Sequence, residues 1–368
     1  MIFSNKLTNN MSENKTNFYT FALNPYVSTN KVENVEKEVN GKGFIMWGSD
    51  NQYPNYLYDL YENCATLQSV INGTVDFVCG DSVQFFLEEC NKKGENIEDI
   101  VKKIAVDYLI FGGFALQVVK NPFGNVVEIY WVDMLKLRSD AKNEVFFYSE
   151  DWSKSVGRVK CLQYPKWAKD DENPTSIYFF KGSKSRRVYP SPVYNAAIDS
   201  AEIEKRITEF HLNEISNNFL SSKIINFNNG TPDLEQMNEV ERNLSEKFGG
   251  SSNAGRFLVS FNENKDSETT VTSLGEDGFA DRYNALAERV ESQIFTAFRA
   301  TPNLFGLPTK TTGFSMQEYE EAFKLYNRTA VKPIQKVIID AFEKIFGQKG
   351  IMTITPFTIE NNVEKTVE

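Results

Sequence analysis

The spacing of apolar residues predicts a mixed helix-and-strand domain over residues 45–190. A turn-rich entry at 50–54 leads into a helical pattern carried by Leu57, Leu60, Leu67, Val70 and Ile71. A second helix is expected to begin after Asn96, a favourable N-cap, with Asp99 at its third position. The Gly112-Gly113 pair is expected to end it.

Strand patterns follow this helix. Residues 114–119 form a predicted strand, and the loop Asn121–Asn125 turns it back into 126–132, which indicates a hairpin. Further short strands are expected at 145–148, 158–164 and 177–181. The domain is therefore predicted to be α+β with a mainly antiparallel sheet.

From residue 191 the pattern changes to long helices around a small β-α-β-β unit. Ser191-Pro192 is typical of a helix start, and that helix is expected to run to about Leu220, roughly 40 Å at 1.5 Å per residue. The small unit is predicted from a strand at 223–227, a helix from Thr231-Pro232 to Gly249-Gly250, and strands at 256–261 and 270–274. Another helix is expected over 282–299.

The last long helix has a clear start signal in Ser315 and Glu318, which match a capping box. Pro333 is expected to kink the helix or break it in two, and Gly347 to end it. A short strand at 351–359 precedes a charged tail.

These patterns divide the chain into eight segments. They are an N-terminal arm (1–44), the α+β domain (45–190), a long helix (191–220), the β-α-β-β unit (221–275), a second long helix (276–299), a Pro/Gly/Thr loop (300–313), a third long helix (314–347) and a tail (348–368). The polar arm, with the aromatic stretch 18–21, is either mobile or ordered by a neighbour, and a purely disordered tail is the alternative.

The two long helices that bracket the small unit have few partners nearby in the sequence. Each must cover its apolar stripe against the other helix or against copies of itself. A self-assembling structural protein follows from this plan, and a helical hairpin that folds onto its own domain is an equally physical alternative.

Composition then limits the class of protein. The 368 residues are enough for two or three domains, and 41% apolar with 13% aromatic residues argues against disorder. No run of 18 apolar residues is present, so no membrane span is expected. The first ten residues lack the apolar region of a signal peptide.

Several kinds of chemistry are excluded by simple counts. A single histidine, His211, rules out a multi-histidine zinc site, and neither G-x-x-x-x-G-K-[ST] nor G-x-G-x-x-G, two common nucleotide-binding motifs, occurs. The four cysteines have no C-x-x-C spacing and are expected to be buried thiols in a reducing compartment. The net charge of −10 means that the chain should not coat DNA, although it could surround DNA.

Collinear stretches over residues 45–347 resemble bacteriophage portal proteins, the ring at one capsid vertex through which DNA is packaged. They are Tyr108–Gln117 with Asn121–Asn125, Tyr189–Pro192, Asn213–Gly230, Phe248–Phe257, Ile294–Leu307 and Tyr326–Ile345. Two features depart from that family. Ser191-Pro192 stands where a Gly-x-Pro is more usual, and few residues follow Gly347, so a large crown of helices is not expected.

The resemblance implies a wing at 45–190, two stem helices at 191–220 and 276–299, and a clip at 221–275. It implies a subunit interface on the stem at Ile203, Ile207, Phe210, Leu286, Val290 and Ile294. It implies partner-facing clip residues at Asn228, Asn229, Glu235, Glu239 and Arg242. It implies a tunnel loop near DNA at Thr309, Lys310, Thr311 and Thr312. From the residue alone, Lys310 is more simply a solvated loop lysine.

The resemblance also implies the partners. They are further copies in a ring of about twelve subunits, double-stranded DNA bound without sequence specificity, the large terminase, a head-completion adaptor, and the major capsid and scaffold proteins. No cofactor, metal, membrane or catalytic residue is implied, because the terminase hydrolyses ATP. The expected location is the virion, with assembly in the host cytoplasm.

Two other classes of protein stay open from the residues. The many acidic residues permit a soluble enzyme that uses paired carboxylates. A helical scaffold or adaptor protein of the virion without a channel is the other alternative.

Overall fold

The computed structural model describes residues 18–19, 34–39, 41–154, 159–182, 186–216, 223–227, 233, 235–236, 238–239, 242, 257–261, 279–306 and 316–358. The chain forms two units. The first comprises Met1–Asn30 and Arg206–Arg282, and the second comprises Lys31–Lys205 and Tyr283–Glu368.

The helical pattern at 57–71 is not one helix but two, α1 (Tyr53–Asn63) and α2 (Ala65–Cys79). Cys64 between them has extended backbone angles, φ −115° and ψ 107°, and is buried. Leu57 and Leu67 are both fully buried on either side of this break. The break therefore lets two short helices turn their apolar faces toward one core.

The next helix, α3 (Ile97–Phe111), begins and ends where the sequence predicts. The Asp99 backbone N–H donates to Asn96 Oδ1 (2.9 Å), and the Asn96 N–H donates to Asp99 Oδ2 (3.3 Å). Gly112 ends the helix with φ +82°. A Cβ there would also lie 1.8 Å from the Ser191 carbonyl oxygen. Both the left-handed backbone angle and this close approach therefore require glycine at position 112.

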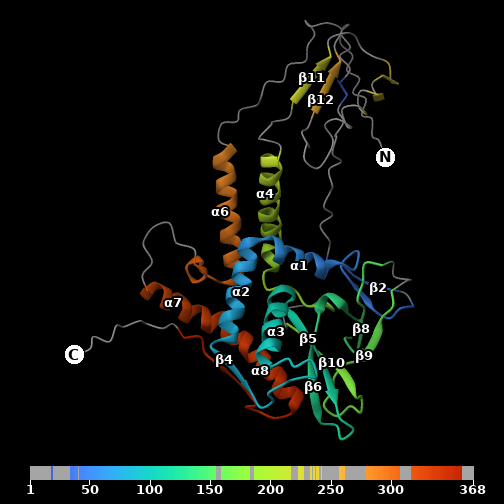
Figure 1. The fold of residues 1–368 in the computed structure, drawn as a ribbon, viewed down its shortest axis with the longest axis vertical. Coiled ribbons are helices and arrows are strands. Elements are labelled where there is room, and N and C mark those ends of the chain that lie inside the picture. Colours follow the sequence, from blue (N-terminus) through green and yellow to red (C-terminus); the bar gives the residue numbers. More distant parts are fainter. Residues whose placement is uncertain are drawn as a thin grey trace, which may run out of the picture. The chain divides into compact units, whose positions relative to one another are not determined.

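The strands of the second unit pair antiparallel, and the predicted hairpin is confirmed. β5 (Gly113–Lys120) lies between β10 (Thr175–Lys181) and β6 (Val126–Val132). A five-stranded sheet has the order β2 (Glu36–Glu38), β3 (Ile45–Trp47), β7 (Leu137–Ser139), β8 (Val145–Tyr148) and β9 (Leu162–Pro165). β4 (Ser82–Phe85) pairs with β13 (Met352–Thr355). α3 packs against β5 and β6, and α2 lies along α3 (Figure 1).

The first long helix, α4 (Ile198–Ser216), begins six residues later than the expected first helical residue, Pro192. A short 3-10 turn, Asn195–Ala197, precedes it. The Ser191 carbonyl lies against Gly112, and the Tyr194 side chain is fully buried. Tertiary contacts therefore hold residues 191–194 in turns, and Pro192 is not the first residue of the helix.

The second long helix, α6 (Phe279–Phe298), is followed by a 3-10 turn, η5 (Pro302–Phe305). The third is not broken in two at Pro333: it continues with helical backbone angles, and a π-helical turn lies just before the proline. α7 (Met316–Tyr326) passes through a π-helical turn, η6 (Asn327–Val331), into α8 (Lys332–Phe346), and Gly347 ends α8 with φ +69°. The predicted capping residue Ser315 lies outside the described residues.

In the first unit, the predicted strands at 223–227 and 256–261 are present as β11 (Lys223–Phe227) and β12 (Phe257–Phe261), which pair parallel. β1 (Phe18–Tyr19), from the aromatic stretch of the N-terminal arm, pairs antiparallel with β12. The expected strand at 270–274 and the expected helix end at 217–220 lie outside the described residues. Within the described part, the arm therefore contributes β1 to one unit and β2 to the other.

Candidate functional site

The second long helix enters the core of the second unit at its C-terminal half. Val290, Ile294, Phe295 and Phe298 are at most 3% exposed. The Phe298 ring stacks on Tyr194 with centroids 5.6 Å apart, and Ser200 Oγ at the start of α4 donates to Gln293 Oε1 (2.7 Å). The two long helices are thus joined where they meet the α+β body.

The start of α4 also holds the α1–α2 junction. Glu204 Oε1 accepts from the Thr66 backbone N–H (2.9 Å), in the first turn of α2, where Cys64 supplies no side-chain cap. The carboxylate thereby complements the positive end of the α2 dipole. Lys205 forms an ion pair with Asp59 of α1.

Exposed apolar side chains remain on the long helices. In the second unit, Ile203 of α4 is 37% exposed and Leu286 of α6 is 38% exposed. In the first unit, Phe210 of α4 is 37% exposed and Ile207 is half-buried. In the first unit, the spacing of 207 and 210 places these two side chains on one helical face.

Two of the six predicted interface residues do not share this exposure. Val290 is 2% exposed and Ile294 is fully buried, both within the core of this one chain. They anchor α6, and they leave Ile203, Ile207, Phe210 and Leu286 as the candidate interface residues, which are named the stem residues below.

The predicted partner-facing residues of the small unit are exposed where they are described. Glu235, Glu239 and Arg242 are helical and exposed. Asp233 stands in the capping position, because the Gln236 N–H donates to Asp233 Oδ1 (2.9 Å) and the Asp233 N–H to Gln236 Oε1 (3.4 Å). Thr231 and Pro232, where the sequence predicts the helix start, lie outside the described residues. Asn228 and Asn229 lie outside the described residues.

The predicted loop residues Thr309, Lys310, Thr311 and Thr312 also lie outside the described residues. Their flanks are described. On the N-terminal side, Arg299 adopts φ +57° and η5 ends at Gly306 with φ +80°. On the C-terminal side, α7 begins at Met316.

A buried arginine that sequence reasoning missed organises the five-stranded sheet. Arg138 is fully buried, and it donates from Nε to Asn51 Oδ1 (2.6 Å) and from its two terminal nitrogens to backbone carbonyls of Asn51, Leu135 and Leu137. Its guanidinium lies 5.0 Å from the Trp152 ring. Burial lowers the pKa of Arg138 to about 10, so the group is still a cation at neutral pH.

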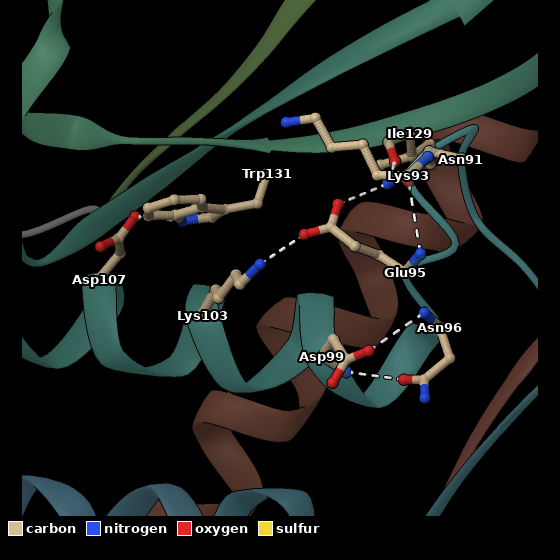
Figure 2. Close-up of polar contacts among 9 residues, drawn as sticks. All are labelled: Asn91, Lys93, Glu95, Asn96, Asp99, Lys103, Asp107, Ile129 and Trp131. Carbon is tan, nitrogen blue, oxygen red and sulfur yellow. Dashed lines mark hydrogen bonds and ion pairs between the residues drawn. The ribbon is translucent and has the colours of Figure 1, made fainter.

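A polar network ties α3 to the outer edge of β6 (Figure 2). Asn91 Nδ2 donates to the Ile129 carbonyl (2.9 Å) and to Glu95 Oε2 (2.7 Å), and Glu95 also accepts from Lys103. The Lys103 hydrogen bond lowers the pKa of Glu95. This network covers a sheet edge and thereby stabilises the fold.

Farther along the same helix, Asp107 accepts a hydrogen bond from Trp131 Nε1 (2.7 Å; Figure 2). Burial raises the pKa of this carboxyl well above its ordinary value. The Trp131 N–H is a neutral donor, so desolvation of the Asp107 carboxylate outweighs this hydrogen bond.

Among the described residues, no group of three potential metal ligands is present, and no helix is long and apolar enough to cross a bilayer. The predicted buried thiols are confirmed for Cys64, Cys79 and Cys90, whereas Cys161 is half-buried. Burial raises the pKa of Cys64, Cys79 and Cys90, which keeps these thiols protonated at neutral pH.

Comparison with known proteins identifies one similar curated sequence. No family model matches the chain. The chain is 26% identical over 260 residues to a probable portal protein of Haemophilus phage HP1 (strain HP1c1), and the match covers 69% of this chain and 71% of that protein. The resemblance to phage portal proteins inferred from the sequence is therefore confirmed.

The fold is similar to parts of gene transfer agent (GTA) particles. The neck of a native particle, computed with C12 symmetry, matches at 16% identity and a TM-score of 0.51, over 82% of this chain and 84% of that chain. The neck of an empty particle, computed with C6 symmetry, matches at 13% identity and a TM-score of 0.52, with the same coverage. At this level of identity the likeness concerns the mixed helix-and-strand fold.

Proposed function

We propose that this chain, a relative of phage portal proteins, is the portal protein of a phage or gene transfer agent particle and forms the channel at one capsid vertex through which DNA is packaged and ejected. The observation that carries this proposal is the 260-residue similarity to a portal protein. The neck structures with C12 and C6 symmetry support a ring of identical subunits, about twelve in number.

The exposed stem residues support the ring. Burying four partly exposed apolar side chains against a neighbour removes apolar surface from water. Each Å² removed stabilises the assembly by roughly 25 cal/mol. The proposed interface consists of Ile203, Ile207, Phe210 and Leu286. Val290 and Ile294 stay in the protomer core.

The charge of the chain supports a channel that does not hold DNA tightly. Twelve chains at −10 each carry about −120 in total, so phosphates are mostly repelled and a translocating duplex is not trapped. We assign the few DNA contacts to the 309–312 segment, with Lys310 as the cation.

The remaining parts of the proposal concern partners. The exposed residues Glu235, Glu239 and Arg242 form the outward surface on which the large terminase and later a head-completion adaptor dock, together with Asn228 and Asn229. The α+β body meets the capsid and scaffold proteins. The protein works in the virion, after assembly in the host cytoplasm. This role needs no catalytic residue in the chain.

Electron microscopy of the purified chain tests the ring. Round end-on views with a central hole are expected, and twelve chains of 42.0 kDa amount to a mass of about 500 kDa. A monomer that hydrolyses a substrate would favour the enzyme alternative, and a filament or small oligomer without a hole would favour the adaptor alternative.

A matched pair of variants on α6 tests the interface. Leu286→Asp places a charge where the neighbour would pack and is expected to reduce ring yield at least tenfold, with an unchanged circular dichroism spectrum. Ser292→Asp adds the same charge at an exposed site of the same helix and is expected to assemble normally. Equal assembly of both variants would contradict the assignment of Leu286.

A further inference from the structure

The N-terminal strand β2 contacts the segment through which the chain enters α4, although 152 residues separate Glu36 from Val188 in the sequence. Glu36 accepts from two consecutive backbone N–H groups of that segment, from Val188 at Oε2 (2.9 Å) and from Tyr189 at Oε1 (2.8 Å). Hydrogen bonds to an ionised carboxylate are stronger than those between neutral groups. Arg187 also donates to the Asn34 carbonyl. The start of β2 and the entry of α4 are therefore joined directly.

Other parts of the α+β body hold the same segment, residues 187–189. Lys181 Nζ donates to the Arg187 carbonyl (2.6 Å), and Asn143 Nδ2 donates to the Val188 carbonyl (3.3 Å). The Tyr189 ring stacks on Trp47 of β3, with centroids 4.4 Å apart and planes 2° apart. These partners come from β10, from the turn before β8 and from β3, and Glu36 adds β2 to them.

Two tight turns connect this segment to α4. In the first, the Asn195 N–H donates to the Pro192 carbonyl (3.2 Å). In the second, the Ala197 N–H donates to the Tyr194 carbonyl (2.7 Å), and α4 follows at once. Because these turns are closed by hydrogen bonds and Tyr194 is fully buried, a shift of residues 188–189 is carried to the first turn of α4.

We propose that β2 is a strap across the entry of α4 and that Glu36 is its positioning residue. Docking of β2 on β3 brings the Glu36 carboxylate onto residues 188–189, and this contact fixes the position from which α4 leaves the α+β body. The coupling is reciprocal, because a contact that links two arrangements stabilises each of them when the other is present. The consequence for assembly rests on the proposed function: a fixed α4 presents Ile203 to a neighbouring copy in the ring.

The test compares Glu36→Gln with Glu38→Gln, an exposed control on the same strand, in the full-length chain. Glutamine keeps the shape of the side chain, but its NH₂ group cannot accept, so one backbone N–H of residues 188–189 loses its partner. Hydrogen exchange of residues 187–199 is expected to be about tenfold faster in Glu36→Gln, as for the loss of a hydrogen bond to a charged group. Exchange in α8 is expected to stay unchanged, because the release is local. Equal exchange of residues 187–199 in the two variants would overturn the inference.

A second variant covers the case in which Glu36→Gln does not fold. Lys181→Met keeps an apolar chain of similar length and removes the donor to the Arg187 carbonyl. Lys181 belongs to β10, not to β2. Reciprocal coupling nevertheless predicts faster exchange of residues 36–39 in this variant, because the loosened segment holds Glu36 less firmly. Unchanged exchange of residues 36–39 in Lys181→Met would overturn the inference.

Ring yield of the purified full-length chain, counted by electron microscopy, separates this inference from the proposed function. Wild type and Glu38→Gln are expected to form rings, and Glu36→Gln is expected to form about tenfold fewer, because ordering a loosened α4 weakens association. Rings absent from all three chains would overturn the proposed function, while the exchange comparison still decides whether the strap exists. Faster exchange of residues 187–199 in Glu36→Gln with an unchanged ring yield would overturn the role of the strap in assembly.

Discussion

Lys120 offers a sharp test of how buried charge holds the α+β body together. Its side chain is only 4% exposed, and its ammonium forms an ion pair with Asp171, whose side chain is 13% exposed. The same nitrogen donates to the backbone carbonyls of Ala168 (2.9 Å), Lys169 (3.2 Å) and Asp171 (3.1 Å). The Lys120 ammonium therefore binds the 168–171 turn to the end of β5.

Lys120→Met keeps the apolar stem and removes the charge. The Asp171 carboxylate then stays largely out of water without its cation, and three carbonyls lose a donor. Breaking a buried ion pair in this way costs about 3–5 kcal/mol of unfolding free energy. Asp171→Asn is expected to cost less, about 1–3 kcal/mol, because the ammonium keeps its carbonyl acceptors and a neutral amide oxygen replaces the carboxylate oxygen.

Urea unfolding, followed by tryptophan fluorescence, measures both losses from the transition midpoints. Wild type and variants are compared at one protein concentration, because self-association stabilises the folded state. The double variant Lys120→Met/Asp171→Asn should cost less than the sum of the single variants, since the two residues interact directly. A loss below 1 kcal/mol for Lys120→Met, or a larger loss for Asp171→Asn, would refute the reasoning.

Two further predictions concern buried charges. Arg138→Lys is expected to lower the free energy of unfolding by about 3 kcal/mol, because one ammonium cannot reach both the Asn51 side chain and the carbonyls that the guanidinium binds. Thermal unfolding measures this loss, and a change within about 0.5 kcal/mol would contradict the prediction. Burial raises the pKa of Asp107, so the folded state keeps a proton on this carboxyl to higher pH than the unfolded state does. Because of this group, the free energy of unfolding is expected to fall as pH rises from the ordinary aspartate pKa to the raised one. Asp107→Asn should flatten that part of the stability–pH profile in urea titrations, and an unchanged slope would show that another group causes it.

Elements defined by neighbouring residues could be predicted from the sequence. The Asn96–Asp99 capping box, the Asn121–Asn125 turn, the helix irregularity next to Pro333 and the end of α8 at Gly347 each depend on residues only a few positions apart. The physical causes are local hydrogen bonds, the fixed φ of proline and the left-handed freedom of glycine. The resemblance to portal proteins likewise depends on the order of short stretches along the chain.

Features that depend on distant residues could not be predicted in this way. The α6 stripe is continuous in sequence, yet Val290 and Ile294 are buried while Leu286 is exposed, because only the C-terminal half of α6 enters the core. The delayed start of α4 depends on Ser191 meeting Gly112, and the Arg138 site depends on Asn51, 87 residues away.

The sequence by itself therefore determined most of the helices and strands, the net charge, and the resemblance to portal proteins. The tertiary structure decided which apolar helix faces are buried within the chain and which stay exposed for a neighbouring molecule. The physical reason is that periodicity records only that a face is apolar. Burial of that face depends on what the rest of the chain places against it, as Phe305 does against Gly73.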